Sequence, residues 1–218
     1  MGLDASEIVV YLGPTLPVTD ARTVLDADYR APVKRGDINS LLAAPPIVVG
    51  LVDGVFFQDL AVSPKEILRA LDMGVRVFGA SSMGALRAAE LGAFGMIGIG
   101  RVFQLFKSGQ IDADDEVAVA YTEPAGRPLS EPMVNIRCAL ERAFNEGIVT
   151  AQERRQLVSR MKRVYFPLRT YSLLFELSRD ILPQTSLTRL QRFLIEHKSD
   201  VKRDDAILML HEIRNLAG

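Results

Sequence analysis

The stretch VRVFGASSMGALRAAEL, residues 75–91, predicts a strand, a tight turn and a helix in immediate succession. Its first residues are mostly β-branched or aromatic, and its last residues are helix formers with apolar side chains at helical spacing. Four small residues lie between them at positions 79–82, where they permit a close approach of the backbone. The turn therefore predicts a site at the start of a helix, where unpaired amides and the helix dipole favour an anion.

The turn from Ala80 to Gly84 matches the small-x-Ser-x-Gly pattern of a nucleophile elbow, with Ser82 at the nucleophile position and Ser81 beside it. Gly84 has no side chain in the first helical turn, so we expect room for a ligand there. The competing interpretation is that one of the two serines only caps the helix, because serine is among the preferred N-cap residues.

Two earlier stretches predict strands that belong to the same sheet. Residues 7–12 are mainly apolar after Glu7, and residues 47–52 are apolar on both faces, which is typical of a central strand in a parallel sheet. Helical stretches separate these strands, and a further strand is predicted at 117–121. The fold class is therefore α/β, with a Rossmann-like parallel sheet and right-handed helical crossovers.

The residues that follow these strands form the predicted site, because the carboxyl ends of parallel strands lie at one edge of the sheet. The first strand ends in Gly13, Pro14 and Thr15, and the second ends in Asp53 and Gly54. A carboxylate after an apolar strand is costly unless it is paired, solvated in a cleft or used in chemistry. The alternative for Asp53 is an ordinary Asp-Gly turn.

The second half of the chain predicts helices only. Five helical stretches are separated by short breaks at Gly147, Pro167 and Pro183. We therefore expect an α/β core at 1–127, followed by an all-helical C-terminal region at 128–218. This region is expected either to pack on the core or to be appended to it.

The composition favours a soluble, cytoplasmic protein. The single cysteine, Cys138, excludes an intrachain disulfide, and its apolar neighbours predict a buried structural thiol. No apolar run has the length of a membrane span, and the N-terminus is unlike a signal peptide. Residues 1–127 hold 11 Lys and Arg against 16 Asp and Glu, and residues 128–218 hold 15 against 11. This modest asymmetry does not indicate a nucleic-acid partner.

Two charged clusters are expected to be solvated. The acidic run at 112–116 lacks the spacing of an EF-hand, so an acidic turn is preferred to a Mg²⁺ site, and neither a metal nor a cofactor is expected. The basic cluster in the helical region is interpreted as a solvated helix face. It consists of Arg154, Arg155, Arg160, Lys162, Arg163 and Arg169.

Six motifs together identify a resemblance to a known family. They are VYLGPTLP at 10–17, APVKRGDI at 31–38, VDGVF at 52–56, SPKEIL at 63–68, GASSMGALRAAEL at 79–91 and DDEVAV at 114–119. In this order they resemble the TfuA-like family. The resemblance implies an accessory protein of YcaO-type, ATP-dependent enzymes, with which it installs thioamides in ribosomally made peptides. The implied partners are a YcaO-type protein, a sulfur-carrier protein or other sulfide donor, and the precursor peptide.

The resemblance implies one of two tasks. The first is to supply sulfide by hydrolysing a thiocarboxylated sulfur carrier, and the second is to recruit the sulfur donor or the peptide to the YcaO enzyme without catalysis. Hydrolysis requires a nucleophile, for which Ser82 or Ser81 is predicted, and neighbouring amides as oxyanion donors. The predicted base is Asp53, Lys34 or a histidine of the helical region.

Four further residues are assigned to binding. Arg35 and Asp37 belong to the same motif as Lys34, and Asp37 is also predicted to cap a short helix. Arg87 and Glu90 lie three residues apart on the predicted helix, a spacing that favours an ion pair. Arg87 could instead bind a substrate carboxylate.

Overall fold

The computed structural model describes residues 3–56, 60–122, 127–198 and 200–217. Contacts between residues group the chain into two compact units, one formed by residues 1–114 with 202–218 and the other by residues 115–201. The C-terminal helix therefore groups with the sheet. The domain division predicted between residues 127 and 128 stays a prediction.

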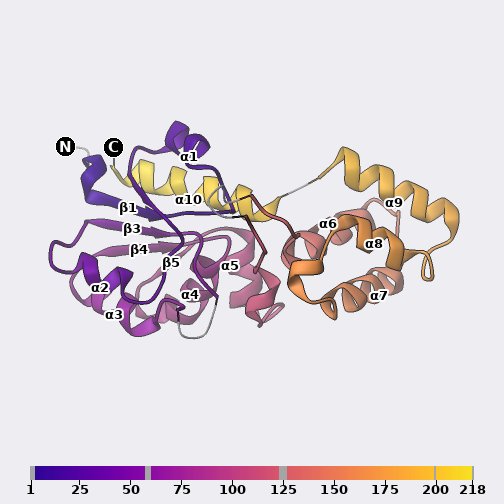
Figure 1. Ribbon diagram of the computed structural model, residues 1–218, viewed down its shortest axis with the longest axis horizontal. Coiled ribbons are helices and arrows are strands. Elements are labelled where there is room, and N and C mark those ends of the chain that lie inside the picture. Colours follow the sequence, from indigo (N-terminus) through magenta and orange to yellow (C-terminus); the bar gives the residue numbers. More distant parts are fainter. Residues whose placement is uncertain (1–2, 57–59, 123–126, 199, 218) are drawn as a thin grey trace. The chain divides into compact units, whose positions relative to one another are not determined.

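The first unit is built on a five-stranded parallel sheet with the strand order β2-β1-β3-β4-β5 (Figure 1). The central strands are β1 (Ile8–Tyr11), β3 (Val48–Leu51) and β4 (Arg76–Gly79), and the edge strands are β2 (Asp28–Arg30) and β5 (Ile97–Gly98). The strands predicted at 7–12, 47–52 and 75–78 are confirmed, as is the parallel α/β fold class.

The prediction of a strand at 117–121 is wrong. A 3-10 helix (Asp114–Glu116) precedes this stretch, and its one recorded pairing is an isolated bridge between Tyr121 and Pro128. Val117 and Ala118 are nevertheless buried. These two apolar side chains are therefore buried, although their residues do not belong to the sheet.

Helices cover both faces of the sheet (Figure 1). One face carries α1 (Val18–Val24) and α10 (Val201–Ala217), and the other carries α2 (Asp37–Leu41), α3 (Pro64–Asp72) and α4 (Met83–Leu91). Helix α5 (Gly100–Lys107) follows β5. These crossovers bury both faces of the central strands, as their continuous apolar sequences predict.

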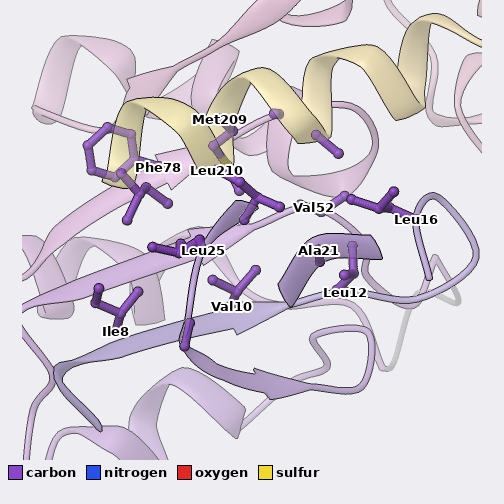
Figure 2. Close-up of a cluster of buried hydrophobic side chains, with 14 of the residues drawn as sticks. Ile8, Val10, Leu12, Leu16, Ala21, Leu25, Val52, Phe78, Met209 and Leu210 are labelled. Atoms are coloured by element: carbon purple, nitrogen blue, oxygen red, sulfur yellow. The ribbon is translucent and has the colours of Figure 1, made fainter. Parts of the chain in front are cut away.

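Alternate residues of the strands form the core beneath α10. Ile8, Val10 and Phe78 are in contact with one cluster of buried side chains that also includes Met209 and Leu210 of α10 (Figure 2). Successive strand residues point to opposite faces of a sheet, so this set of even-numbered positions lies on one face. The C-terminal helix is thus an integral part of the α/β unit.

Asp205 joins α10 to the start of α5. Its carboxylate accepts hydrogen bonds from the amides of Arg101 at 2.8 Å and Val102 at 2.7 Å. Gly100 has a φ of +92°, and a side chain there would overlap this carboxylate. Burial raises the pKa of Asp205 to about 6, although the two amide hydrogen bonds lower it.

Because this pKa is raised in the folded state, stability contributed by Asp205 is complete below its ordinary pKa of 3.8 and is lost as the pH rises through about 6. The expected loss is on the order of 3 kcal/mol. We expect the difference in free energy of unfolding between the wild type and Asp205→Asn to fall over this range. Urea unfolding at a series of pH values measures it, and a difference independent of pH would contradict the prediction.

The second unit is helical. It contains α6 (Met133–Asn145), α7 (Ala151–Lys162), α8 (Tyr171–Ser178) and α9 (Gln184–Glu196). Leu140, Leu157, Leu174 and Leu190 are fully buried in its core, so each helix contributes to one shared apolar cluster. The prediction of helices in this part of the chain is confirmed. In the described stretches of the whole chain, no helix combines the length and hydropathy that crossing a membrane requires.

The acidic run and part of the basic cluster bind each other, so the prediction that both are solvated is wrong for these residues. Arg169 is 1% exposed and bonds to the carboxylate of Asp115, which also pairs with Lys162. Buried Glu116 accepts two hydrogen bonds of 2.8 Å from Arg137. Burial by itself raises the pKa of Asp115, but hydrogen bonds from Arg169 and Lys162 outweigh burial and lower it.

Candidate functional site

The ends of the three central strands meet at one edge of the sheet. Tyr11, Leu51 and Gly79 are neighbours in register at the carboxyl ends of β1, β3 and β4. Asp53 and Ser82 follow two of these strands and therefore lie at the same edge. The juxtaposition predicted from the sequence is confirmed.

Asp53 fastens the loop that follows β1. One carboxylate oxygen accepts hydrogen bonds from the amides of Gly13 at 2.9 Å and Thr15 at 3.0 Å, and the other accepts one from the Thr15 hydroxyl at 2.6 Å. Asp53 is buried, and these bonds satisfy a group that would otherwise be costly there. Pro14 lies within the loop that is held. The sequence located Asp53 at the strand end, and the structure adds its partners.

The loops of this edge pack closely on the start of α4. Gly54 forms an isolated bridge with Val33, and a side chain at Gly54 would lie 2.7 Å from the Cγ of Met83. Val33 also donates its amide to the carbonyl of Asp53 at 2.9 Å. The residues on either side of this contact, Lys34 and Ser82, are thereby brought to the same part of the edge.

Ser81 occupies the strained position of the turn. Its φ is +66°, and no other residue of the described stretches apart from glycine has a positive φ. Such a conformation costs about 1–3 kcal/mol and is typical of the sharp turn between strand and helix in a nucleophile elbow. The Ser81 side chain is fully buried, and its hydroxyl donates to the carbonyl of Lys202 at 2.7 Å. This hydroxyl therefore already holds the start of α10.

The hydroxyl of Ser82 has no such role. Ser82 is at the N-cap position of α4, but its side chain makes no capping hydrogen bond. No other hydrogen-bond partner of this hydroxyl occurs among the residues that the structure describes. Ser82 therefore occupies the N-cap position that the alternative interpretation predicts, but without the side-chain hydrogen bond by which serine usually caps a helix. Ser82 is also only 2% exposed, so a substrate must reach a nearly covered hydroxyl.

Gly84 is required by the packing of the backbone. A side chain at this position would overlap the carbonyl oxygen of Leu51, and Gly79 makes the corresponding contact with the carbonyl of Gly84. The expectation that Gly84 leaves room for a ligand is wrong on that side, because the end of β3 fills the space. The amide of Gly84 donates to Val52 at 3.2 Å and that of Ala85 to Ala80 at 3.2 Å, so neither is available to an oxyanion.

The loop with Lys34, Arg35 and Asp37 lies beside Gly54. Asp37 is the first residue of α2 and accepts from the amide of Lys34 at 2.9 Å, so it does not occupy the predicted N-cap position. The Lys34 ammonium is 3.5 Å from the carboxylate of Asp37, and the side chain of Lys34 is 60% exposed. Arg35 is also exposed. Lys34 is thus a weakly paired cation at the edge of the sheet.

Arg87 and Glu90 form the ion pair that their spacing predicts. The guanidinium of Arg87 lies 2.7 Å from the carboxylate of Glu90 and also donates to the carbonyl of Val62 at 3.1 Å. Arg87 thus contacts one residue of its own helix and one residue that comes just before α3. Binding of a substrate carboxylate by Arg87 stays a prediction.

The two histidines belong to different units, and the cysteine belongs to the second unit. His211 is on α10 in the first unit, and His197 follows α9 in the second. Cys138 lies on α6 and is partly exposed, so the prediction that it is buried is wrong. Neighbouring Ala139 and Leu140 are buried, as its apolar context predicts.

Two residues at this edge were not predicted. Lys202 is buried and accepts the Ser81 hydroxyl through its carbonyl, and Glu66 is buried and accepts from the amide of Gly36 at 2.8 Å. Glu66 also forms a capping box with Ser63 at the start of α3. Lys202 lies 121 residues after Ser81 in the chain, so no local pattern connects it with the turn at Ser81.

Metal binding finds no support at this edge. Within the described ranges, no group of three or more His, Cys, Asp or Glu side chains is arranged to hold a metal ion.

Comparison with known families gives a match that begins after the motifs at 10–17 and 31–38 and continues beyond the motif at 114–119. The family model described as TfuA-like protein matches residues 53–170, which is more than half of the chain. The matched range begins at Asp53, includes the turn at Ser82 and continues through α6 and α7 of the second unit. No curated protein shows significant similarity to the chain.

Proposed function

Because the chain belongs to the TfuA-like protein family, we propose that it supplies sulfide to a YcaO-type enzyme for the thioamidation of ribosomally made peptides. Family membership supports an accessory role beside a YcaO-type partner. The finer proposal is that the chain hydrolyses the C-terminal thiocarboxylate of a sulfur-carrier protein. The observation that carries it is the Ser82 hydroxyl, which lies at the start of α4 without a capping bond.

In the proposed reaction, the oxygen of Ser82 attacks the carbonyl carbon of the thiocarboxylate. The C–S bond breaks, the serine proton leaves with the sulfur as hydrosulfide, and an ester between Ser82 and the carrier is formed. Water then hydrolyses the ester, which restores the serine and releases the carrier carboxylate. An oxyanion would face the start of α4, where the amide of Met83 has no acceptor in the described part of the chain.

The proposed base is Lys34 or Asp53. Asp53 would have to give up three hydrogen bonds to the loop after β1, whereas Lys34 would have to leave one partly solvated ion pair. Val33 and Met83 both contact Gly54, and Lys34 and Ser82 are their respective neighbours in the chain. Lys34 is a cation in this ion pair and has no lone pair, so it can act as the base only after it has lost its own proton, whereas the carboxylate of Asp53 can accept a proton directly.

If Lys34 is the base, Lys34→Gln is expected to slow sulfide release by about 10²–10⁴-fold, because a general base contributes that much to a proton transfer. The matched control is Lys65→Gln, which removes an equally exposed charge from α3 and should leave the rate unchanged. The measurement is the rate of sulfide release from a thiocarboxylated carrier. Equal rates for the two variants would remove Lys34 from the mechanism and leave Asp53 or a histidine.

A second function is an adaptor that recruits the sulfur donor or the peptide to the YcaO enzyme without catalysis. The observation that favours it is the small exposure of Ser82 together with the fully bonded carboxylate of Asp53. The purified chain, incubated with a thiocarboxylated carrier alone, separates the two functions. Sulfide release supports the hydrolase. No release, in a system where thioamidation still requires the chain, supports the adaptor.

A further inference from the structure

The helical unit contains a cavity of about 350 Å³ that the proposed sulfide release does not use. It is lined by residues from the C-terminal end of α6, the chain just after it, and α9 with the histidine that follows. Its volume lies in the range of sites that hold small ligands, roughly 300–1,000 Å³. A short segment of polypeptide with a few side chains fits this size.

Three arginines line the cavity, and the guanidinium groups of two of them make no ion pair or hydrogen bond with the described residues. Arg142 donates to the carbonyl of His197 at 3.3 Å, and its guanidinium lies 5.7 Å from the ring centre of Phe193. Arg189 and Arg192 are one helical turn apart on α9, so they share a face. Across the described ranges neither has an ion pair or a hydrogen-bonded side chain. Two adjacent guanidinium groups with spare donors are suited to bind a carboxylate.

One wall of the cavity is apolar. Ile148 is a buried member of the core of the helical unit, and Phe193 packs against that core. Arg142 covers the face of the Phe193 ring, and the ring of His197 lies at 5.0 Å from it. The cavity therefore offers an apolar surface next to guanidinium groups, which suits a ligand that carries an apolar group beside a carboxylate.

Two carboxylates in the same lining limit the charge of the ligand. Glu146 and Glu196 line the cavity, and neither forms an ion pair with any described residue. Their charges oppose an anion with several charges, such as a nucleotide polyphosphate. Carboxylates also accept hydrogen bonds from amides, which a peptide backbone provides. The combination favours a peptide over a phosphorylated small molecule.

We propose that this cavity binds an acidic segment of a polypeptide, with a carboxylate held by Arg189 and Arg192 and an adjacent apolar side chain placed against Ile148 and Phe193. The site gives the accessory protein a means of holding a polypeptide partner that is separate from the edge of the sheet. The inference does not depend on the chemistry of Ser82, so either can fail without the other.

The test is calorimetric titration of the full chain with a blocked pentapeptide that has one glutamate among four leucines. The paired variant Arg189→Gln with Arg192→Gln should lower the affinity at least about 10-fold, as the loss of charge-assisted hydrogen bonds predicts. The matched control is Arg155→Gln with Arg163→Gln, which removes the same charge from exposed positions on α7 and its C-cap. This control should bind the peptide as the wild type does.

Three results would overturn the proposal. The first is equal binding of the matched leucine and glutamine peptide, since the carboxylate would then not be recognised. The second is an equal loss of affinity in both paired variants, which would indicate attraction by net charge alone. The third is competition by ATP. If ATP binds more tightly than the peptide and displaces it from the chain, the cavity would be assigned to a polyphosphate. Circular dichroism of each variant checks that it is folded.

Discussion

Ser82→Ala is expected to slow the release of sulfide from a thiocarboxylated carrier by several orders of magnitude. If the Ser82 oxygen forms the covalent ester, its removal eliminates that route, and only binding and oxyanion contributions remain. The same change should leave the free energy of unfolding nearly constant, because this hydroxyl makes no capping bond whose loss would cost about 1 kcal/mol. A large kinetic effect with a small effect on stability is the signature of a nucleophile.

The control for this variant is Ser81→Gly, which removes the neighbouring hydroxyl without adding strain. Glycine adopts the φ of +66° freely, whereas alanine there would retain the strain of Ser81. Loss of the hydrogen bond to Lys202 costs about 1 kcal/mol, which the relief of strain at this position offsets, and sulfide release should stay close to that of the wild type. Rates near wild type for Ser82→Ala, for Ser81→Gly and for the double variant would remove serine catalysis and leave the adaptor.

The local pattern of residues 75–91 was sufficient to predict a strand, a turn and a helix, because the backbone conformation of each residue there depends on its near neighbours in the sequence. The rule that parallel crossovers gather strand ends at one edge then placed Asp53 and Ser82 together. The polar edge strand β2 was missed, since a strand that is half exposed lacks the continuous apolar pattern of β1 and β3.

Contacts between distant segments could not be predicted from the sequence. The carboxylate of Asp53 bonds to amides 38 and 40 residues earlier, and amides carry no side-chain signal. Gly84 was expected to leave room for a ligand, but local sequence does not distinguish space for a ligand from space filled by the carbonyl of Leu51. The sequence also could not predict that Arg189 and Arg192 line a cavity, because an arginine on a helix has the same sequence pattern whether it lines a cavity or faces solvent.

One buried arginine, Arg169, holds Asp115 of the acidic run, whereas Asp112 and Asp114 are exposed and Glu116 pairs with Arg137 and Lys162. Arg169 donates to the carbonyls of Val164 at 3.0 Å, Lys162 at 3.1 Å and Asp115 at 2.6 Å, and to the carboxylate of Asp115 at 2.6 Å. A planar guanidinium with five N–H donors can satisfy all of these acceptors at once, whereas a lysine cannot. Removing it would leave buried acceptors unpaired.

Arg169→Met is therefore expected to lower the free energy of unfolding by about 3–5 kcal/mol, the usual cost of removing one partner from a buried ion pair. Arg169→Lys should restore only a minor part. The matched control is Arg160→Met, whose pair with Asp180 is largely exposed and should be worth about 1 kcal/mol or less. Urea unfolding followed by far-ultraviolet circular dichroism measures all three variants. Similar losses for Arg169→Met and Arg160→Met would show that the acidic run is held by its apolar neighbours, Val117 and Ala118, and not by the guanidinium.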